Sequence, residues 1–185
     1  MKDKKLEIGL IGGSEKRVIQ IVDYNEHWPI KFEAHSKTIR DSLGDVAINI
    51  EHIGSTAVPG LAAKPIIDML LIVKDSSDEH KYLKELQMAG YQLRVREPDF
   101  HEHRMFRTLE KDVHIHVLSA GSSEIDRYLV FRNRLRINAI DRKEYEATKR
   151  KLAAAEWSDM NDYATAKTQI VERIIAAGFA NRKER

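Results

Sequence analysis

The chain has 185 residues, of which 42% are hydrophobic and 32% are charged, and its formal net charge is +2. This length and composition are typical of one globular domain with a substantial core. Because the charges nearly balance, the molecule as a whole is not a polyanion-binding surface, and any affinity for phosphate must come from local clusters of cations. The chain has no cysteine, which excludes a disulfide framework and thiolate metal sites and suits a reducing compartment.

Residues 1–17 are expected to form a loosely ordered arm, followed by a single domain over residues 18–185. The arm has basic residues before a short apolar run, which is too interrupted for a signal sequence or a membrane span. We therefore expect a cytoplasmic protein with no membrane partner. Residues 18–22 are predicted to form a short strand.

A mixed α/β (α+β) core is predicted up to about residue 120, with a helical part over 121–180. The first helix contains Pro29 in its first turn and ends at Gly44. A second helix is capped by Ser76 or Ser77 and ends at Gly90. Strands are predicted at 46–53, 66–73, 91–95, 104–109 and 113–118, the last two joined by a hairpin at 110–112 where no residue favours positive φ. Helices are predicted at 123–140, 142–157 and 160–177.

The stretch from Glu51 to Val73 contains a Gly54-Ser55 turn followed by Asp68 in a nearly continuous apolar strand. An ionised carboxylate there is costly unless it is paired or binds a cation. Gly54 lets the backbone approach a phosphate, and the side chains and amides of Ser55 and Thr56 can donate to phosphate oxygens. Lys64, in the loop between turn and strand, supplies a point charge for phosphate or is a solvated lysine.

The histidines are concentrated near this stretch. His114 and His116 share one strand face, as two ligands of a common metal would, although hydrogen-bonded strand residues show the same spacing. His101 and His103 are expected at the surface. His52 precedes Gly54 by two residues.

Four cations lie inside the apolar stripes of the predicted C-terminal helices, namely Arg132, Arg136, Lys149 and Lys167. Inward cations need anionic partners. They either pair with buried acids, extend past the edge of the core, or line a cleft that receives phosphates or carboxylates. Their recurrence in successive helices favours the anion cleft.

The segment IEHIGSTAVPGLAAKPIIDMLLIV resembles the signature of the GrpB-like family, an uncharacterised branch of the nucleotidyltransferase superfamily. The segments YNEHWPIKF, HIHV and FRNRLRIN, and Tyr-x-x-x-Lys patterns at 145–149 and 163–167, support this resemblance over nearly the whole chain beyond the arm. In some proteins a similar domain is joined to a dephospho-coenzyme A kinase.

The resemblance implies a mixed sheet flanked by helices, with the Gly-Ser turn holding nucleotide phosphates. It also implies acids on adjacent strands that hold magnesium and align a triphosphate for attack by an acceptor. Gly54 and Ser55 match the turn, and Asp68 matches the first metal acid. The usual partner acid is Leu70 here, and the strand of a third acid offers His114 and His116, so two-metal chemistry is in doubt.

Three functions follow from these observations. The first is a metal-dependent nucleotidyltransferase with Asp68 on Mg²⁺ or Mn²⁺ and with His114 or His116 as second ligand or general base. The second is a non-catalytic module that binds a nucleotide or coenzyme. The third is a phosphohydrolase with zinc or manganese held by His52, Asp68, His114 and His116. The partner is expected to be a phosphorylated small molecule rather than nucleic acid, because the basic residues are dispersed and no aromatic ladder accompanies them.

Overall fold

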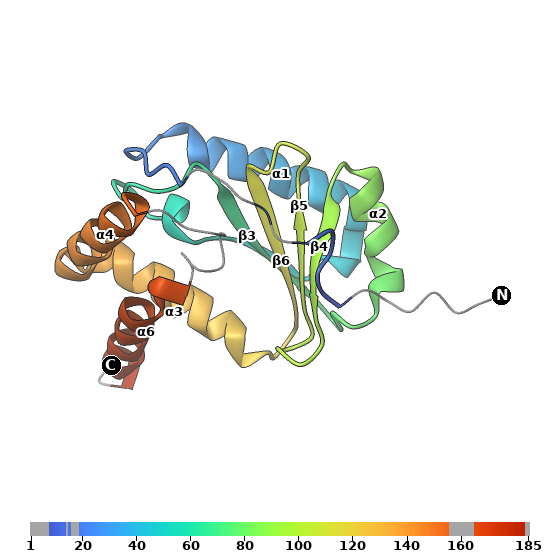
Figure 1. Ribbon diagram of the computed structural model, residues 1–185. Helices are drawn as coiled ribbons and strands as arrows, with labels where there is room; N and C mark the ends of the chain where they lie inside the picture. The colour runs from blue at the N-terminus through green and yellow to red at the C-terminus, as the bar shows by residue number, and fades with distance from the viewer. Residues whose placement is uncertain (1–7, 14, 16–18, 156–164, 184–185) are drawn as a thin grey trace.

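A computed structural model describes residues 8–13, 15, 19–155 and 165–183 of the chain. Its centre is a six-stranded sheet with the strand order β1-β4-β5-β6-β3-β2 (Figure 1). The strands are β1 (Gly9–Leu10), β2 (Asn49–Ile53), β3 (Ile67–Val73), β4 (Gln92–Glu97), β5 (His103–Arg107) and β6 (Val113–Ser119). Only the β3–β6 pair is parallel and the other pairs are antiparallel, so the predicted mixed sheet is confirmed.

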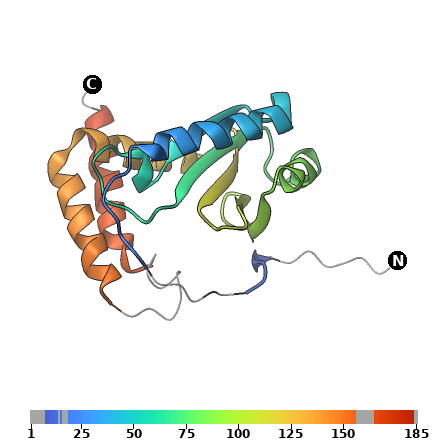
Figure 2. The same ribbon diagram turned by 90° about the horizontal axis from the view of Figure 1, so that it is seen from above.

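Helices cover both faces of the sheet. Helices α1 (His27–Leu43) and α2 (Leu83–Met88) pack on one face over the main hydrophobic core (Figure 2). Helix α3 (Ser123–Ile137) covers a smaller apolar cluster on the other face, which includes Ile53, Leu70 and Leu118. The central strand β3 is therefore buried on both sides, as its continuous apolar sequence predicts.

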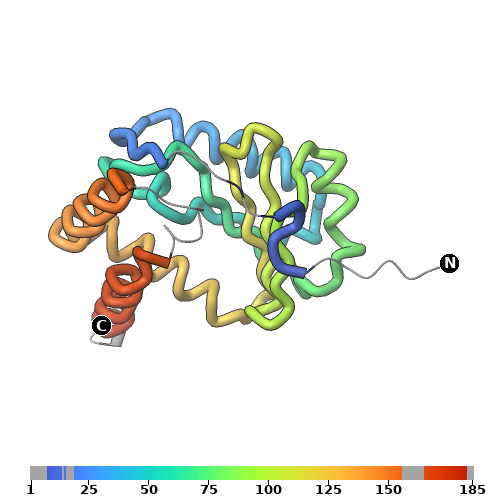
Figure 3. The backbone as a smooth tube through the Cα atoms, viewed as in Figure 1, coloured from blue at the N-terminus to red at the C-terminus, as the bar shows by residue number. Residues whose placement is uncertain are grey.

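The C-terminal helices are gathered beyond the β2 edge of the sheet. Helix α4 (Ala139–Ala153) follows α3, and α6 (Thr168–Lys183) packs along α3, at the opposite end of the molecule from β1 (Figure 3). The helix predicted at 123–140 breaks at Asn138, because the Asn138 side chain accepts a hydrogen bond of 2.9 Å from the Asp141 amide and caps α4. Part of the helix predicted at 160–177 lies outside the described residues. None of the described helices is long and apolar enough to cross a membrane.

The N-terminal segment differs from the expectation. Within the range predicted as a strand at 18–22, the described residues contribute one isolated bridge, between Val22 and Ala63. By contrast, Gly9–Leu10 adds a strand to the sheet that the sequence did not predict. The buried Arg94 side chain donates hydrogen bonds to the carbonyls of Ile11 and Gly13, which explains why this segment lies on β4.

One local prediction, a serine cap on the second helix, was wrong, and the predicted hairpin at 110–112 is confirmed. Ser76 does not cap a helix, because its hydroxyl bonds the Ser119 hydroxyl at 2.9 Å and α2 begins only at Leu83. In the β5–β6 hairpin, Lys111 adopts a φ of 61°, although lysine does not favour the left-handed region. Lys111 also bonds Glu15 at 3.1 Å, which holds the hairpin against the N-terminal segment.

Candidate functional site

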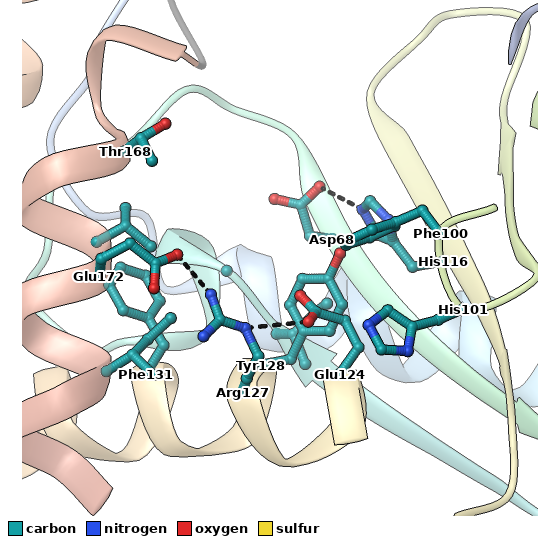
Figure 4. Close-up of a pocket in the computed structure, with 14 residues that line it drawn as sticks. Asp68, Phe100, His101, His116, Glu124, Arg127, Tyr128, Phe131, Thr168 and Glu172 are labelled. Atoms are coloured by element: carbon teal, nitrogen blue, oxygen red, sulfur yellow. Dashed lines mark hydrogen bonds and ion pairs between the residues drawn. The ribbon is translucent and has the colours of Figure 1, made fainter. Parts of the chain in front are cut away.

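Asp68 lies near the start of β3, between Ile53 of β2 and His114 of β6. Its Oδ1 atom is 3.5 Å from His114 Nδ1. The same atom is 3.8 Å from His116 Nε2, and Figure 4 shows this His116 contact. Burial opposes ionisation of the carboxyl, but hydrogen bonds and charge from the two histidines outweigh it and hold the pKa of Asp68 well below its usual range. Asp68 is therefore an ionised carboxylate whose side chain remains 31% exposed.

The Gly-Ser turn after β2 packs directly on this carboxylate. Gly54 has a φ of 69°, and a Cβ atom there would lie 2.6 Å from Asp68 Oδ2. Glycine is required for both reasons, and it brings the backbone close to Asp68. The Ser55 side chain hydrogen-bonds Tyr145 of α4. The Thr56 hydroxyl is used within the protein, because it donates to the Ile66 carbonyl at 3.2 Å.

A small cavity of about 50 Å³ adjoins Asp68 and is lined by three lysines, Lys64, Lys149 and Lys167, together with Ser55 and Thr56. Lys149 is only 2% exposed, lies 4.8 Å over the Tyr145 ring and donates to the Ala62 carbonyl. Burial, and then the charge of Lys167, lower the pKa of Lys149 to about 7. Burial also lowers the pKa of Lys167, against the opposing charge of Asp68. An anion in this cavity would favour the charged form of each lysine.

The two arginines of the predicted anion cleft do not join these lysines. Arg132 Nη1 donates to Glu51 Oε2 at 2.7 Å and to the His52 carbonyl at 2.8 Å, and Arg136 Nε donates to the Ala57 carbonyl at 2.9 Å. Neither arginine lines the lysine cavity or the larger pocket described below. The expectation of one cleft with four cations was therefore wrong, because Arg132 finds its anion in Glu51 and both arginines brace β2 and its turn.

A larger pocket of about 720 Å³ lies on the other side of Asp68, between α6 and the strand ends (Figure 4). Its charged rim includes Arg127, whose Nε is 3.0 Å from Glu124 and whose Nη2 binds Glu172. The other lining residues are Ile53, Gly54, Asp68, Phe100, His101, His116, Tyr128, Phe131, Thr168, Val171 and Ile175. The size and the mainly apolar floor are typical of a small-molecule site.

His103 was expected at the surface, but it is buried and linked to His116. His103 Nε2 lies 3.0 Å from His116 Nδ1, its Nδ1 lies 2.7 Å from Glu97 Oε2, and the two rings stack at 5.2 Å. Burial and the neighbouring His116 and Arg104 lower the pKa of His103 to about 3, so its ring is neutral. Its Nδ1–H then donates to Glu97 and its Nε2 accepts from His116 Nδ1–H, so the other ring nitrogen of His116, Nε2, is the one that faces Asp68.

The pairing of β5 with β6 brings these groups together, and the sequence signal for it was the pair of His-x-His motifs. His116 lies opposite Met105, two residues from His103 on the same face of β5. The two motifs lie close together in the sequence, but only the strand register decides which histidines meet.

His52 does not belong to this site. It pairs with Met69 on the opposite face of the sheet, where it stacks on Phe32 at 4.7 Å and bonds the Thr56 hydroxyl at 3.0 Å. Burial lowers its pKa to about 4. The proposed ligand set of His52 with Asp68, His114 and His116 was wrong for the simple reason that alternate strand residues face opposite sides.

The residues at Asp68 do not fit a two-metal centre. Leu70 is fully buried in the cluster under α3, and its neighbour Glu51 is paired with Arg132. Among the residues described, no three His, Asp or Glu side chains form a ready-made metal site. One carboxylate does fit a single Mg²⁺ or Mn²⁺ ion that also binds substrate phosphates, which is the usual way magnesium is held beside nucleotides.

Comparison with known proteins places the chain in a family. A family model described as "GrpB protein" matches residues 18–177. A UPF0157 protein of Halalkalibacterium halodurans is 51% identical over 85% of this chain and 80% of its own length. The crystal structure of the conserved protein GrpB from Enterococcus faecalis superposes with a TM-score of 0.79 at 31% identity, covering 88% of this chain and 99% of that one.

The fold also occurs in nucleotidyltransferases. A structure of the Cid1 poly(U) polymerase with Mg and 3′-dATP bound superposes with a TM-score of 0.51 at 12% identity, covering 79% of this chain and 49% of that one. This likeness concerns the fold alone. The family match and the similarity to the H. halodurans protein extend over most of the chain, and together they show that the chain belongs to the GrpB family.

Proposed function

We propose that this GrpB protein is a metal-dependent enzyme of the nucleotidyltransferase type, which acts on a nucleoside triphosphate and a small acceptor. The observation that carries the proposal is the position of Asp68, whose carboxylate borders both the three-lysine cavity and the 720 Å³ pocket. A cationic cavity beside an ionised carboxylate can hold phosphate and a shared divalent cation at one place.

Each side chain has a defined role in this proposal. Lys64, Lys149 and Lys167 hold the phosphates and offset their charge, with Ser55 as a donor at the Gly54 turn. Asp68 holds one Mg²⁺ or Mn²⁺ ion, which would neutralise charge on the phosphates.

His116 would act as general base and take up the proton of the acceptor on its Nε2 atom, while its Nδ1–H is held by His103 and, through His103, by Glu97. The acceptor oxygen or nitrogen then forms a bond to the α-phosphorus as the bond to the pyrophosphate leaving group breaks. Arg132 and Arg136 support the turn and have no role at the phosphates.

A non-catalytic nucleotide- or coenzyme-binding module is the second candidate. Leu70 favours it, because this fully buried side chain occupies the place of a second acid and belongs to the core under α3. The phosphohydrolase hypothesis loses its support, since it required His52 among the metal ligands.

Binding and turnover separate the two candidates. Thermal unfolding is measured with each nucleoside triphosphate and with coenzyme A, in the presence and absence of Mg²⁺ or Mn²⁺. A ligand present at about a hundred times its Kd stabilises the folded state by roughly 2.7 kcal/mol, which raises Tm by several degrees. We expect a metal-dependent shift with a triphosphate that is lost in Asp68→Asn and reduced in Lys149→Met.

Lys143→Met, which removes an exposed lysine from the same helix, is the matched control and should behave like the wild type. Release of pyrophosphate is then followed by ³¹P NMR with mixtures of small alcohols and amines. Pyrophosphate release that needs Asp68 supports the enzyme, whereas tight binding without release across the acceptors favours the non-catalytic module. Absence of a triphosphate effect on Tm contradicts the enzyme, and absence of any effect of the triphosphates and of coenzyme A contradicts both candidates.

A further inference from the structure

We propose that the 720 Å³ pocket binds an uncharged or cationic group with an apolar or aromatic body, and that it rejects anions. The inference deepens the proposed function, because it assigns the chemistry of the organic group that lies on the far side of Asp68 from the phosphates. Three observations support it: the charges that line each cavity, the apolar side chains of the large pocket, and the difference in volume between the two cavities.

The two cavities beside Asp68 have opposite charge. Three lysines face one carboxylate in the small cavity. In the large pocket three carboxylates, those of Asp68, Glu124 and Glu172, face the single guanidinium of Arg127. An anionic group is therefore attracted to the lysine side of Asp68 and repelled from the other side, where a cation or a neutral hydrogen-bond donor is favoured.

Arg127 is not available to attract an anion into the large pocket. Its Nε faces Glu124 at 3.0 Å and its Nη2 binds Glu172, so the guanidinium already has a carboxylate on each side. Glu172 is half-exposed and reaches from α6, whereas Glu124 is mostly buried on α3. The group of three links the two helices across the pocket and leaves spare carboxylate lone pairs toward it (Figure 4).

The rest of the lining selects an apolar body. Tyr128 and Phe131 come from α3, Val171 and Ile175 from α6, and Phe100 from the loop before β5. The small cavity measures only about 50 Å³, so a ligand with its phosphate there must place its organic part outside it. The adjoining 720 Å³ pocket has the volume that drug-sized ligands occupy.

Three small probes with the same phenylethyl stem test the proposal, namely phenethylamine, 2-phenylethanol and 3-phenylpropionate. Binding is measured on the full chain by methyl NMR of Ile53, Val171 and Ile175, which line the pocket. We expect shifts of these methyls with the amine and the alcohol, and at least tenfold weaker binding of the carboxylate. Equal binding of the carboxylate, or no shift from any probe, overturns the inference.

Charge-neutral variants sharpen the test. Glu172→Gln should weaken binding of the amine by about two- to fivefold and leave the alcohol unchanged, the size expected for a half-exposed charge. Glu144→Gln is the matched control, because Glu144 is similarly exposed and does not line the pocket. Its carboxylate pairs with Arg173 at a distance of 2.8 Å. Loss of amine affinity in Glu144→Gln, or none in Glu172→Gln, contradicts a role for the pocket's carboxylates.

A second titration with saturating ATP and Mg²⁺ identifies the source of the group. Displacement of the amine by ATP means that the pocket holds the nucleoside end of the nucleotide, and joint binding means that it holds a second substrate. Both outcomes retain the proposed chemistry. If neither ATP nor any other nucleoside triphosphate binds, the proposed function fails, while the contrast between amine and carboxylate still decides this inference.

Discussion

At the scale of single residues, the site depends on the approach of a glycine to a carboxylate. Gly54 has positive φ, and its missing Cβ leaves space for Asp68 Oδ2 at 2.6 Å from the ideal Cβ position. The sequence indicated that a Gly-Ser turn and a strand acid act together. The expected reason for the glycine was close approach of the backbone to a phosphate. The sequence did not indicate that the glycine is also needed to make room for the Asp68 carboxylate.

Gly54→Ala should lower the free energy of unfolding by roughly 2–4 kcal/mol, from left-handed strain plus the clash with Asp68. Urea unfolding gives this value, and the thermal shift with triphosphate and metal should disappear. Gly60→Ala is the control, because Gly60 has a φ of 75° but no atom within 4 Å of its ideal Cβ. It should cost about 1–2 kcal/mol and keep ligand binding. Equal effects of the two substitutions would contradict the contact argument.

His52 makes stability depend on pH. Burial lowers its folded-state pKa to about 4, below the value of 6.5 in an unfolded chain. The unfolded chain therefore binds the proton first, and stability falls as the pH drops from about 6.5 toward 4. This one group should cost ~2 kcal/mol at pH 5 relative to pH 7.

Urea unfolding between pH 7 and pH 4.5 measures this dependence. His52→Gln should be less stable at pH 7 but should show a shallower fall with pH. His80→Gln, which replaces an exposed histidine, should keep the wild-type slope. An unchanged slope in His52→Gln would mean that the imidazole is not held neutral by burial.

At the scale of elements, the large pocket depends on close packing of α3 against α6. A Cβ at Gly178 of α6 would lie 2.4 Å from Val130 Cγ1 of α3. The apolar periodicity of both helices predicted that each would bury a face. It could not show that a glycine in a helix marks the contact, because such a glycine is equally compatible with a helix end.

Gly178→Ala should destabilise the protein by roughly 1–3 kcal/mol, because the clash with Val130 exceeds the gain in helix propensity of about 1 kcal/mol. Val130→Ala removes the clashing methyl groups and is destabilising alone. The double variant should lose less stability than the sum of the losses in the two single variants. A double-mutant cycle of urea unfolding measures the difference. Strictly additive losses would show that the two helices do not meet at this point.

At the scale of the whole molecule, the segment before residue 18 contributes to the sheet. Gly9–Leu10 pairs with β4, Arg94 binds two carbonyls of this segment, and Glu15 bonds Arg107 at 2.7 Å. The family model begins only at residue 18. The residues of this segment that make the contacts therefore precede the range that the family model matches, whereas their partners on β4 and β5 lie within it.

Deletion of residues 1–15 should cost about 1–3 kcal/mol, because the buried Arg94 loses its acceptors. It also exposes the edge of β4, which favours pairing with a second copy. Light scattering coupled to size exclusion should show more self-association than in the full chain, with triphosphate binding retained. Glu15→Gln, which removes only the charge, should not change the oligomeric state. If the deletion variant is as stable as the wild type, the segment does not contribute to stability and is a loosely ordered arm, as the sequence predicted.

The sequence by itself determined the elements that carry a strong local signal. Strand β3 follows from its continuous apolar residues, α1 from its apolar stripe ended by Gly44, and the α/β core from the order of strands and helices, whereas the mixed sheet was implied by the family resemblance. The same local reading identified Asp68, Lys149 and Lys167, because a charged residue within an apolar pattern needs a partner. Patterns of this kind depend only on neighbours within a few residues.

Tertiary structure decided which partner each charged residue meets. The register of β5 and β6 places His103 beside His116, and the alternation of side chains along β2 places His52 on the opposite face of the sheet. The packing of α3 pairs Arg132 with Glu51. The three lysines Lys64, Lys149 and Lys167 lie together beside Asp68. These contacts connect residues far apart in the chain. Their choice depends on the packing of the whole core, because a shift of one residue along a strand reverses the face of every side chain on it.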